Sequence, residues 1–217
     1  MTLATGSLLS VNLGGIREFE YGGRSAKSAI WKYPVTGRVE ARGVNLAGDD
    51  QADRAAHGGP DKATYAYAVE DYRWWESEMG RRLDYGQFGE NLTTQGIDVT
   101  NALVGERWEV GSMLLEVSEP RIPCWRLGVR MEDKLFPRRF TKVSRPGTYL
   151  RIIVEGDVVG RRSDPRYRSS RSRPHDRRRF PHLHPGPARG VETSRRSASI
   201  GKLANVGGEA PRERTTR

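Results

Sequence analysis

The chain has a single cysteine among its 217 residues, Cys124, so a disulfide within the chain is excluded. Histidine is also scarce, and only His57 precedes residue 160. One thiol and one such imidazole cannot supply the four ligands of a structural zinc site. No apolar run approaches the roughly 20 residues needed to cross a bilayer, and the N-terminus lacks the basic and apolar segments of a secretory signal. These absences lead us to expect a cytoplasmic protein with no membrane partner.

Glycine pairs are present, but no phosphate-binding P-loop or dinucleotide fingerprint can be built from them. Gly14-Gly15 and Gly22-Gly23 lack the required spacing and the helix that should follow. A Cys–His pair of the protease kind is conceivable from composition, although no orienting partner favours it.

Positive charge is concentrated in the last quarter of the chain. Residues 161–217 hold 16 of the 37 Lys and Arg but 5 of the 27 Asp and Glu, a net charge of +11. Residues 1–160 carry 21 basic and 22 acidic residues, a net charge of −1. The overall charge of +10 therefore describes the tail and says little about the partners of the first 160 residues.

The tail is rich in Arg, Pro, Ser and His and has no apolar alternation. Such a segment buries too little apolar area to offset its ordering entropy, so we expect disorder. It is either a nucleic-acid-binding arm or the product of GC-rich coding DNA read out of frame. We favour the frameshift, and so do not expect nucleic acid as a partner. The predicted organisation is a domain at 5–160 followed by a basic tail at 161–217.

The predicted fold is mainly β, of the α+β class, with one main helix near 64–79. Aromatic and aliphatic residues at helical spacing occupy 65–79, and Gly80 follows as a stop signal. Tight connections are expected at 110–112 and 156–157. Short runs rich in β-forming residues, joined by irregular connections, favour a closed or partly closed barrel. The expected strands cover 6–12, 29–34, 38–42, 106–110, 113–119, 149–155 and 158–159.

Cys124 is the residue most suited to chemistry. A thiolate is a soft metal ligand and a strong nucleophile. Pro120 and Pro123 fix φ and remove two backbone donors, which predicts that Cys124 lies on a stiff loop, with Arg121 three residues before it. The alternative is that Cys124 is only a small buried apolar side chain.

A second candidate is the turn that contains His57, Gly58, Asp61 and Lys62. Amides at paired glycines and at the start of a helix expected near Thr64 would bind an anion, to which Lys62 adds a charge. His57 is equally consistent with a structural, hydrogen-bonded histidine, and Asp61 with a helix cap.

A third candidate is the segment 88–94, which has the pattern of a loop entering a strand. Gly89 would let the backbone approach another group closely, and the Asn91 amide can both donate and accept hydrogen bonds. Such groups suit a planar heterocycle. Glu90 could act as an acid or base, but we expect a solvated charge.

Four strings in this order resemble the MOSC domain family, in its YiiM-like bacterial branch, over roughly residues 5–160. After residue 160 this chain departs from the family, whose members usually continue with a further strand and a short helical tail. The four strings are Gly48-Asp49-x-Gln51-Ala52-Asp53, His57-Gly58-Gly59-Pro60-Asp61-Lys62-Ala63, Phe88-Gly89-Glu90-Asn91-Leu92 and Pro120-Arg121-x-Pro123-Cys124-Trp125.

The resemblance implies a β-barrel domain that binds the molybdenum cofactor, a pterin dithiolene with a phosphate tail. Cys124 matches the family's metal-ligating cysteine and would be the catalytic residue. By the same matching, Arg121 and Asn91 contact the pterin or an oxo group, beside Gly89. The turn that carries His57, Gly58, Asp61 and Lys62 would line the pocket.

The family is associated with two kinds of function. One is the reduction of small N-hydroxylated compounds, such as hydroxylaminopurine-type base analogues, with electrons from an external reductase. The other is a non-catalytic role as a carrier of the cofactor or of sulfur. A pyridoxal phosphate association also follows the family name, but no lysine motif for it stands out, so we do not expect that cofactor.

Overall fold

The computed structural model describes residues 6–54 and 58–160, and every statement below refers to these residues. The predicted site residue His57 and the predicted tail at 161–217 lie outside the described residues. So does residue 5, the predicted start of the domain.

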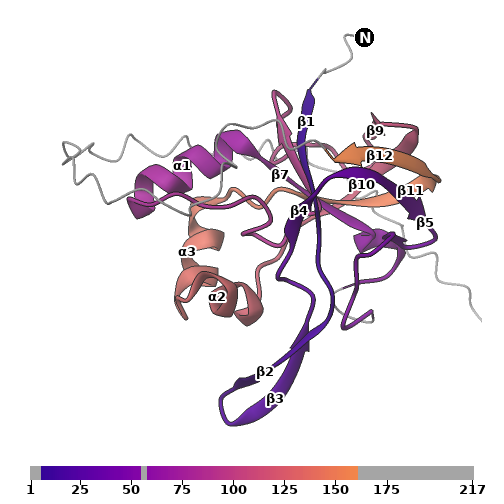
Figure 1. Ribbon diagram of the computed structural model, residues 1–217. Helices are drawn as coiled ribbons and strands as arrows, with labels where there is room; N and C mark the ends of the chain where they lie inside the picture. Colours follow the sequence, from indigo (N-terminus) through magenta and orange to yellow (C-terminus); the bar gives the residue numbers. More distant parts are fainter. Residues whose placement is uncertain (1–5, 55–57, 161–217) are drawn as a thin grey trace, which may run out of the picture. The chain divides into compact units, whose positions relative to one another are not determined.

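The framework is a seven-stranded sheet in the order β4-β1-β8-β7-β11-β10-β9 (Figure 1). All neighbours are antiparallel except β7 and β8, which are parallel. The strands are β1 (Ser7–Leu13), β4 (Tyr33–Val35), β7 (Thr64–Ala68), β8 (Leu92–Gln95), β9 (Arg107–Val110), β10 (Met113–Pro120) and β11 (Thr148–Val154).

A second, three-stranded sheet has the order β12-β5-β6, from Gly156–Gly160, Gly37–Arg42 and Asn45–Leu46. Only Glu155 separates β11 from β12, so the chain passes between the sheets in one residue. Gly156, expected in a turn, instead begins β12, and a Cβ there would lie 2.6 Å from the Ser112 carbonyl oxygen. The mainly β class is confirmed, but no closed barrel forms in the described residues. The end strands β4 and β9 do not pair with each other, and β12, β5 and β6 form a separate sheet in which β5 is central.

The predicted helix at 65–79 begins later than expected. Residues Tyr65–Ala68 belong to β7, and helix α1 covers Val69–Met79 before Gly80 ends it in the left-handed conformation. Every residue of β7 is buried, with Tyr65 and Tyr67 in one apolar cluster and Ala66 and Ala68 in another. A short strand buried on both faces gives an apolar run that periodicity cannot separate from a helix.

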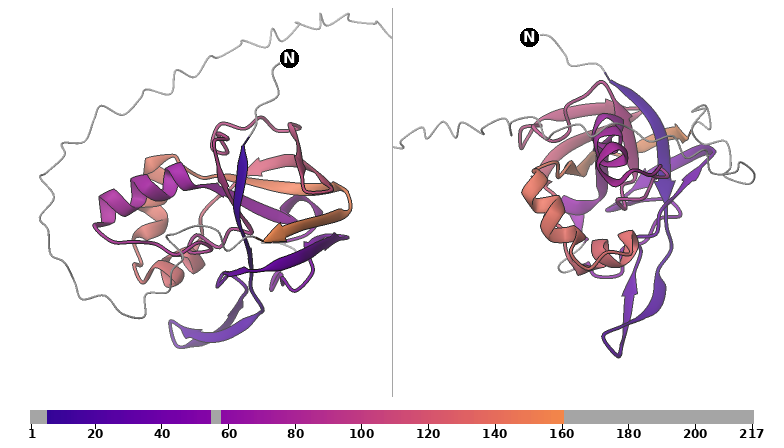
Figure 2. Two further views of the ribbon diagram at one scale, coloured as in Figure 1. Left: turned by 45° about the horizontal axis from the view of Figure 1, so that its top comes forward. Right: turned by 90° about the vertical axis from the view of Figure 1, so that its left-hand side faces the viewer.

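Other elements were not predicted. Strands β2 (Arg17–Tyr21) and β3 (Arg24–Ser28) form a separate hairpin that extends away from the main sheet in Figures 1 and 2. Helices α2 (Trp125–Met131) and α3 (Phe136–Val143) follow β10, and a single 3₁₀ turn, η1, spans Pro60–Lys62. Of the strand expected at 29–34, only its end is in β4, whereas the remaining predicted strands occur with shifts of one or two residues.

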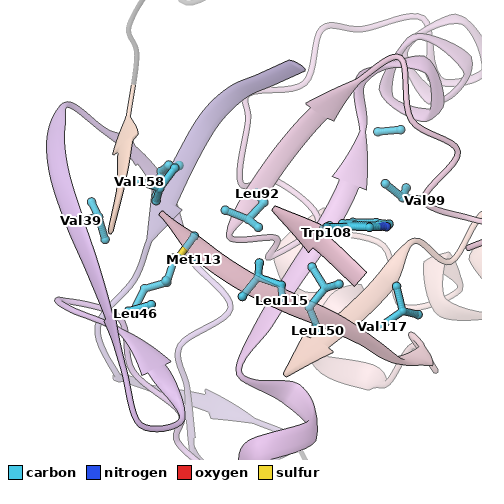
Figure 3. Packing of buried hydrophobic residues seen from close by; sticks show 14 residues of the cluster. Val39, Leu46, Leu92, Val99, Trp108, Met113, Leu115, Val117, Leu150 and Val158 are labelled. Carbon is cyan, nitrogen blue, oxygen red and sulfur yellow. The ribbon is translucent and has the colours of Figure 1, made fainter. Parts of the chain in front are cut away.

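Two apolar clusters cover the two faces of the main sheet. One lies between the sheets and includes Leu92, Leu115 and Leu150 of the main sheet and Val39 and Val158 of the small sheet, with Met113 and Leu46 between them (Figure 3). The other joins β7 to the three helices and is largely aromatic; it includes Tyr67, Tyr72, Trp75, Phe88, Phe136 and Phe140. No described helix is long and apolar enough to cross a membrane.

Candidate functional site

A pocket opens where strand ends and loops from distant parts of the sequence meet. Strands β7 and β11 supply Tyr65 and Tyr149, while the loop before β8 supplies Gly89 and Asn91. The remaining lining residues are Ser28, Ala29, Ile30, Lys32, Asp49, Asp50, Gln51, Ala52, Asp53, Lys62, Ala63, Arg121, Cys124 and Arg126.

Cys124 lies between β10 and α2 and lines this pocket. Its backbone is extended, with φ −121° and ψ 175°, and it is the residue that precedes the first turn of α2, where its carbonyl accepts a hydrogen bond from the Leu127 amide at 3.0 Å. The thiol is free and half-buried. The predicted loop position is therefore confirmed, and the helix that follows immediately was not foreseen.

Arg121 is 7% exposed and lines the same pocket. Its guanidinium donates a hydrogen bond to the Phe88 carbonyl, and its Cζ lies 4.7 Å from the centre of the Tyr65 ring. Burial by itself lowers the pKa of Arg121, but the neighbouring Tyr65, Tyr149 and Cys124 raise it overall, so the group stays charged. No carboxylate in the described part of the chain pairs with it. A buried cation without a paired carboxylate is a group that could hold an anion at this end of the pocket.

Lys32 and Asp49 form a buried ion pair in the pocket wall, with Nζ 2.5 Å from Oδ2. Burial lowers the pKa of Lys32, and Asp49 opposes that effect. Asn91 donates to Asp49 Oδ2 at 2.9 Å and to the Asn12 carbonyl at 3.2 Å, and it accepts from the Tyr65 amide at 3.2 Å. The Asn91 side chain therefore orients Asp49 and joins β1 to β7.

The turn at 58–62 is only partly in the pocket. Lys62 lines it, lies 2.6 Å from Glu119, and has a raised pKa because of that hydrogen bond. Asp61 is outside the lining and pairs with Arg151 at 3.0 Å. Gly58 is also outside the lining, and a Cβ there would lie 2.5 Å from the Gln51 side-chain oxygen. The segment from Thr64 is strand β7, so no helix starts there, and the only helical turn beside it in the described residues is η1 at Pro60–Lys62.

Glu90 is fully buried, and our expectation of a solvated charge was wrong. Its Oε1 accepts hydrogen bonds from the Tyr72 hydroxyl at 2.6 Å, the Gly86 amide at 2.7 Å and the Thr93 hydroxyl at 2.8 Å. Its Oε2 is buried without a hydrogen-bond partner in the described residues. Burial raises the pKa of Glu90. Local partners at residues 86 and 93 and the distant Tyr72 together hold this carboxyl, and the local pattern alone did not reveal its burial.

Gly89 makes the close approach predicted for it. Its φ is +76°, and a Cβ would lie 2.7 Å from Ile30 Cγ1 on the opposite wall of the pocket. A side chain at this position would push the two walls apart.

The pocket thus brings together five of the eight predicted site residues, Cys124, Arg121, Asn91, Gly89 and Lys62. Sequence reasoning missed Lys32, Tyr65 and Tyr149. A lysine between Trp31 and Tyr33 is a signal of a buried, paired cation that could have identified Lys32. The two tyrosines lie in strands and give no such signal. Among the described residues, no group of three or more His, Cys, Asp or Glu could hold a metal ion.

Comparison with known proteins gives concordant results. Residues 53–160 match the model of the MOSC domain. The chain is 37% identical over 152 residues to the uncharacterized protein YflK of Bacillus subtilis, covering 70% of this chain and 69% of YflK. It is 33% identical over 157 residues to a protein of Gibberella moniliformis named Reductase, covering 70% of this chain but 28% of that protein.

Among solved structures, YiiM from Geobacillus stearothermophilus is similar, with 28% identity and a TM-score of 0.56. The match covers 71% of each chain. The sequence identity to YflK, the matched domain model and the shared fold agree with one another. The chain belongs to the MOSC domain family and is YiiM-like.

Proposed function

We propose that this chain binds the molybdenum cofactor in the pocket and is an oxidoreductase that reduces small N-hydroxylated compounds. The observation that carries the proposal is the presence, in one pocket, of a free thiol and a buried, uncompensated guanidinium, Cys124 and Arg121. The family membership and the relative named Reductase support the reaction class.

The pocket fits the cofactor chemically. A thiolate suits a metal already held by dithiolene sulfur, because soft ligands select sulfur-rich centres. Cys124 would be the protein ligand of the metal, while Arg121 and Lys62 would hold the phosphate or another anionic group. When bound, the group supplies a two-electron centre for oxygen-atom chemistry. Of the other predicted contacts, Asn91 and Gly89 shape the wall, and Gly58 and Asp61 support the turn that carries Lys62.

The chain's own residues fix the wall of the pocket and offer a hydrogen-bond donor in it. The Lys32–Asp49 pair and Asn91 fix part of the pocket wall through buried hydrogen bonds. Tyr149 contributes a phenol whose pKa is raised by burial, so it stays neutral at physiological pH. A neutral phenol in the pocket is a hydrogen-bond donor for an N–O oxygen.

The test is the molybdenum content of protein produced in a host that makes the cofactor, measured by elemental analysis. We expect close to one molybdenum per wild-type chain and at least a tenfold loss in Cys124→Ser. Ile122→Ser is the matched control, because Ile122 is in the same loop, is 82% exposed and does not line the pocket.

Full retention of molybdenum by Cys124→Ser would show that Cys124 is not the ligand. A second measurement follows the reduction of 6-hydroxylaminopurine by wild-type protein with reduced methyl viologen. Bound molybdenum without turnover would instead support the carrier role.

A further inference from the structure

Charge is unevenly distributed over the first 160 residues, and the uneven part adjoins the pocket. Residues 121–145 contain eight Lys and Arg but two Asp and Glu, a net charge of +6. The other residues of 1–160 contain 13 Lys and Arg and 20 Asp and Glu, a net charge of −7. The net charge of −1 of residues 1–160 therefore conceals a separation of charge along the sequence, in which the positive segment starts at pocket residue Arg121.

The positive segment folds into α2 and α3, which lie next to each other in Figures 1 and 2. The inner side of α3 is fixed by the buried Phe136 and Phe140. Arg138 and Lys142 are four residues apart, so they share one side of the helix, and Lys134 precedes them by the same interval. We call the exposed residues Lys134, Arg138 and Lys142 the basic face.

The cations of the basic face are free for an external partner. Within the described residues none of the three forms an ion pair, whereas Arg139 pairs with Asp133 at 3.2 Å and Arg145 pairs with Asp71. Leu135, next to Lys134, is apolar and 61% exposed to solvent. Exposed, unpaired cations beside an exposed apolar side chain favour encounter with an acidic protein through complementary charge.

The basic face is also connected to the pocket. Helix α2 begins directly after Cys124, and its Arg126 lines the pocket. The turn from Glu132 to Leu135 joins α2 to α3. Between Arg121 and Cys124, Ile122 is 82% exposed and marks the rim. A protein bound across α2 and α3 would therefore lie beside the pocket opening.

We infer that the α2–α3 surface, centred on the basic face, is the docking site for an acidic electron-transfer protein that delivers electrons to the group bound in the pocket. This inference rests on the proposed function, which needs an external electron donor. The charge distribution steers such a donor, because the positive segment attracts an acidic protein and the remainder of 1–160 repels it. Nucleic acid is disfavoured, because Glu132, Asp133 and the apolar side chains interrupt the positive surface.

The experiment compares two triple variants of the full chain with equal net charge. Lys134→Glu/Arg138→Glu/Lys142→Glu reverses the basic face. Arg73→Glu/Arg81→Glu/Arg82→Glu is the matched control, since these arginines are exposed, outside 121–145 and without ion pairs among the described residues. The probe is an acidic [2Fe–2S] ferredoxin, kept reduced by its NADPH-dependent reductase, and reduced methyl viologen serves as the donor that needs no docking.

We expect reversal of the basic face to lower ferredoxin-dependent reduction of 6-hydroxylaminopurine at least tenfold and to leave the viologen-dependent rate within twofold. The control variant should stay within twofold with both donors. The wild-type rate with ferredoxin should fall as ionic strength rises from 20 to 300 mM. Equal losses in both variants, or a ferredoxin rate independent of salt, would overturn the assignment.

Binding of the oxidised ferredoxin, measured by calorimetry on cofactor-free protein, separates this inference from the proposed function. Loss of binding only on reversal of the basic face, with no turnover by any donor, would retain the docking site and reject the reductase activity. Binding of a 20-base-pair DNA duplex that displaces the ferredoxin would instead identify the surface as a nucleic-acid site.

Discussion

At the scale of single residues, the site depends on charges that are buried and paired in specific ways. Lys32, Glu90 and Arg121 are all less than a tenth exposed, although their residue types are normally on the surface. Lys32 has a carboxylate partner, Arg121 has a carbonyl and a ring, and Glu90 has hydrogen bonds to one oxygen only. The sequence identifies each of these residues as charged. Only the surrounding contacts show which of the buried charges lacks an oppositely charged partner.

Glu90 gives a prediction on pH and stability. Because burial raises its pKa in the folded chain, the folded state holds a proton that the unfolded state releases near the ordinary value of about 4.3. The free energy of unfolding must then fall as pH rises from that value towards the raised pKa. Glu90→Gln is neutral at every pH, so we expect equal stability near pH 4 and about 1–3 kcal/mol more than wild type at pH 8.

The measurement is urea unfolding of both proteins across this pH range. Thr93→Val serves as a comparison, because it removes one hydrogen bond to Glu90 without removing the carboxyl. A stability difference between Glu90→Gln and wild type that does not change with pH would show that Glu90 does not titrate in this range.

At the scale of elements, the β2–β3 hairpin pairs with no other described strand and packs against the rest of the chain chiefly through aromatic side chains. The Phe19 ring lies 4.9 Å from that of Trp31, and the Tyr21 ring is stacked on that of Trp125 at 4.3 Å. Trp125 directly follows Cys124, and Ser28, the last residue of β3, lines the pocket. The hairpin therefore connects two walls of the site.

We expect Phe19→Ala to increase amide hydrogen exchange in residues 17–28 by tenfold or more, with less than about 1 kcal/mol change in global stability. Loss of a packed aromatic pair removes roughly 1–3 kcal/mol locally, and the hairpin can open without disturbing the sheets. Hydrogen exchange by mass spectrometry measures the effect. Glu20→Ala, on the same hairpin but exposed, is the control. Unchanged exchange in Phe19→Ala would show that other contacts hold the hairpin.

At the scale of the whole domain, one strand joins both apolar clusters. Along β7, Ala66 belongs to the cluster between the sheets, and Tyr67 to the cluster under the helices. If either cluster loses its packing, one face of this strand is exposed, and the strand against which the other cluster packs is weakened. The seven-stranded sheet, the three-stranded sheet and helices α1, α2 and α3 should therefore unfold as one cooperative unit.

We expect Leu92→Ala and Phe140→Ala, one from each cluster, each to lower the free energy of unfolding by about 2–5 kcal/mol. In both variants the protein should still unfold in one transition. Urea unfolding should give coincident curves by tryptophan fluorescence and by far-ultraviolet circular dichroism for both variants. A separate early transition in Phe140→Ala would mean that the helices unfold independently of the sheets.

The sequence by itself determined the features that depend on local chemistry. Turn glycines, alternating strands and the proline-flanked cysteine were all predicted from sequence patterns. Four short sequence motifs indicated the family. The position of Cys124 before a helix, the strand at 64–68 and the open edges of the sheets were decided by tertiary structure. A five-residue apolar run takes its conformation from what covers its two faces.

The same division holds for the site. Cys124, Arg121, Asn91, Gly89 and Lys62 were predicted and line one pocket, whereas Lys32, Tyr65 and Tyr149 joined them only in three dimensions. Residue type can be read from the chain, but burial and pairing depend on partners far away in sequence. Glu90 is the clearest case, because Asn12 and Tyr72, which are 78 and 18 residues away, help to make a surface-type residue into a buried carboxyl.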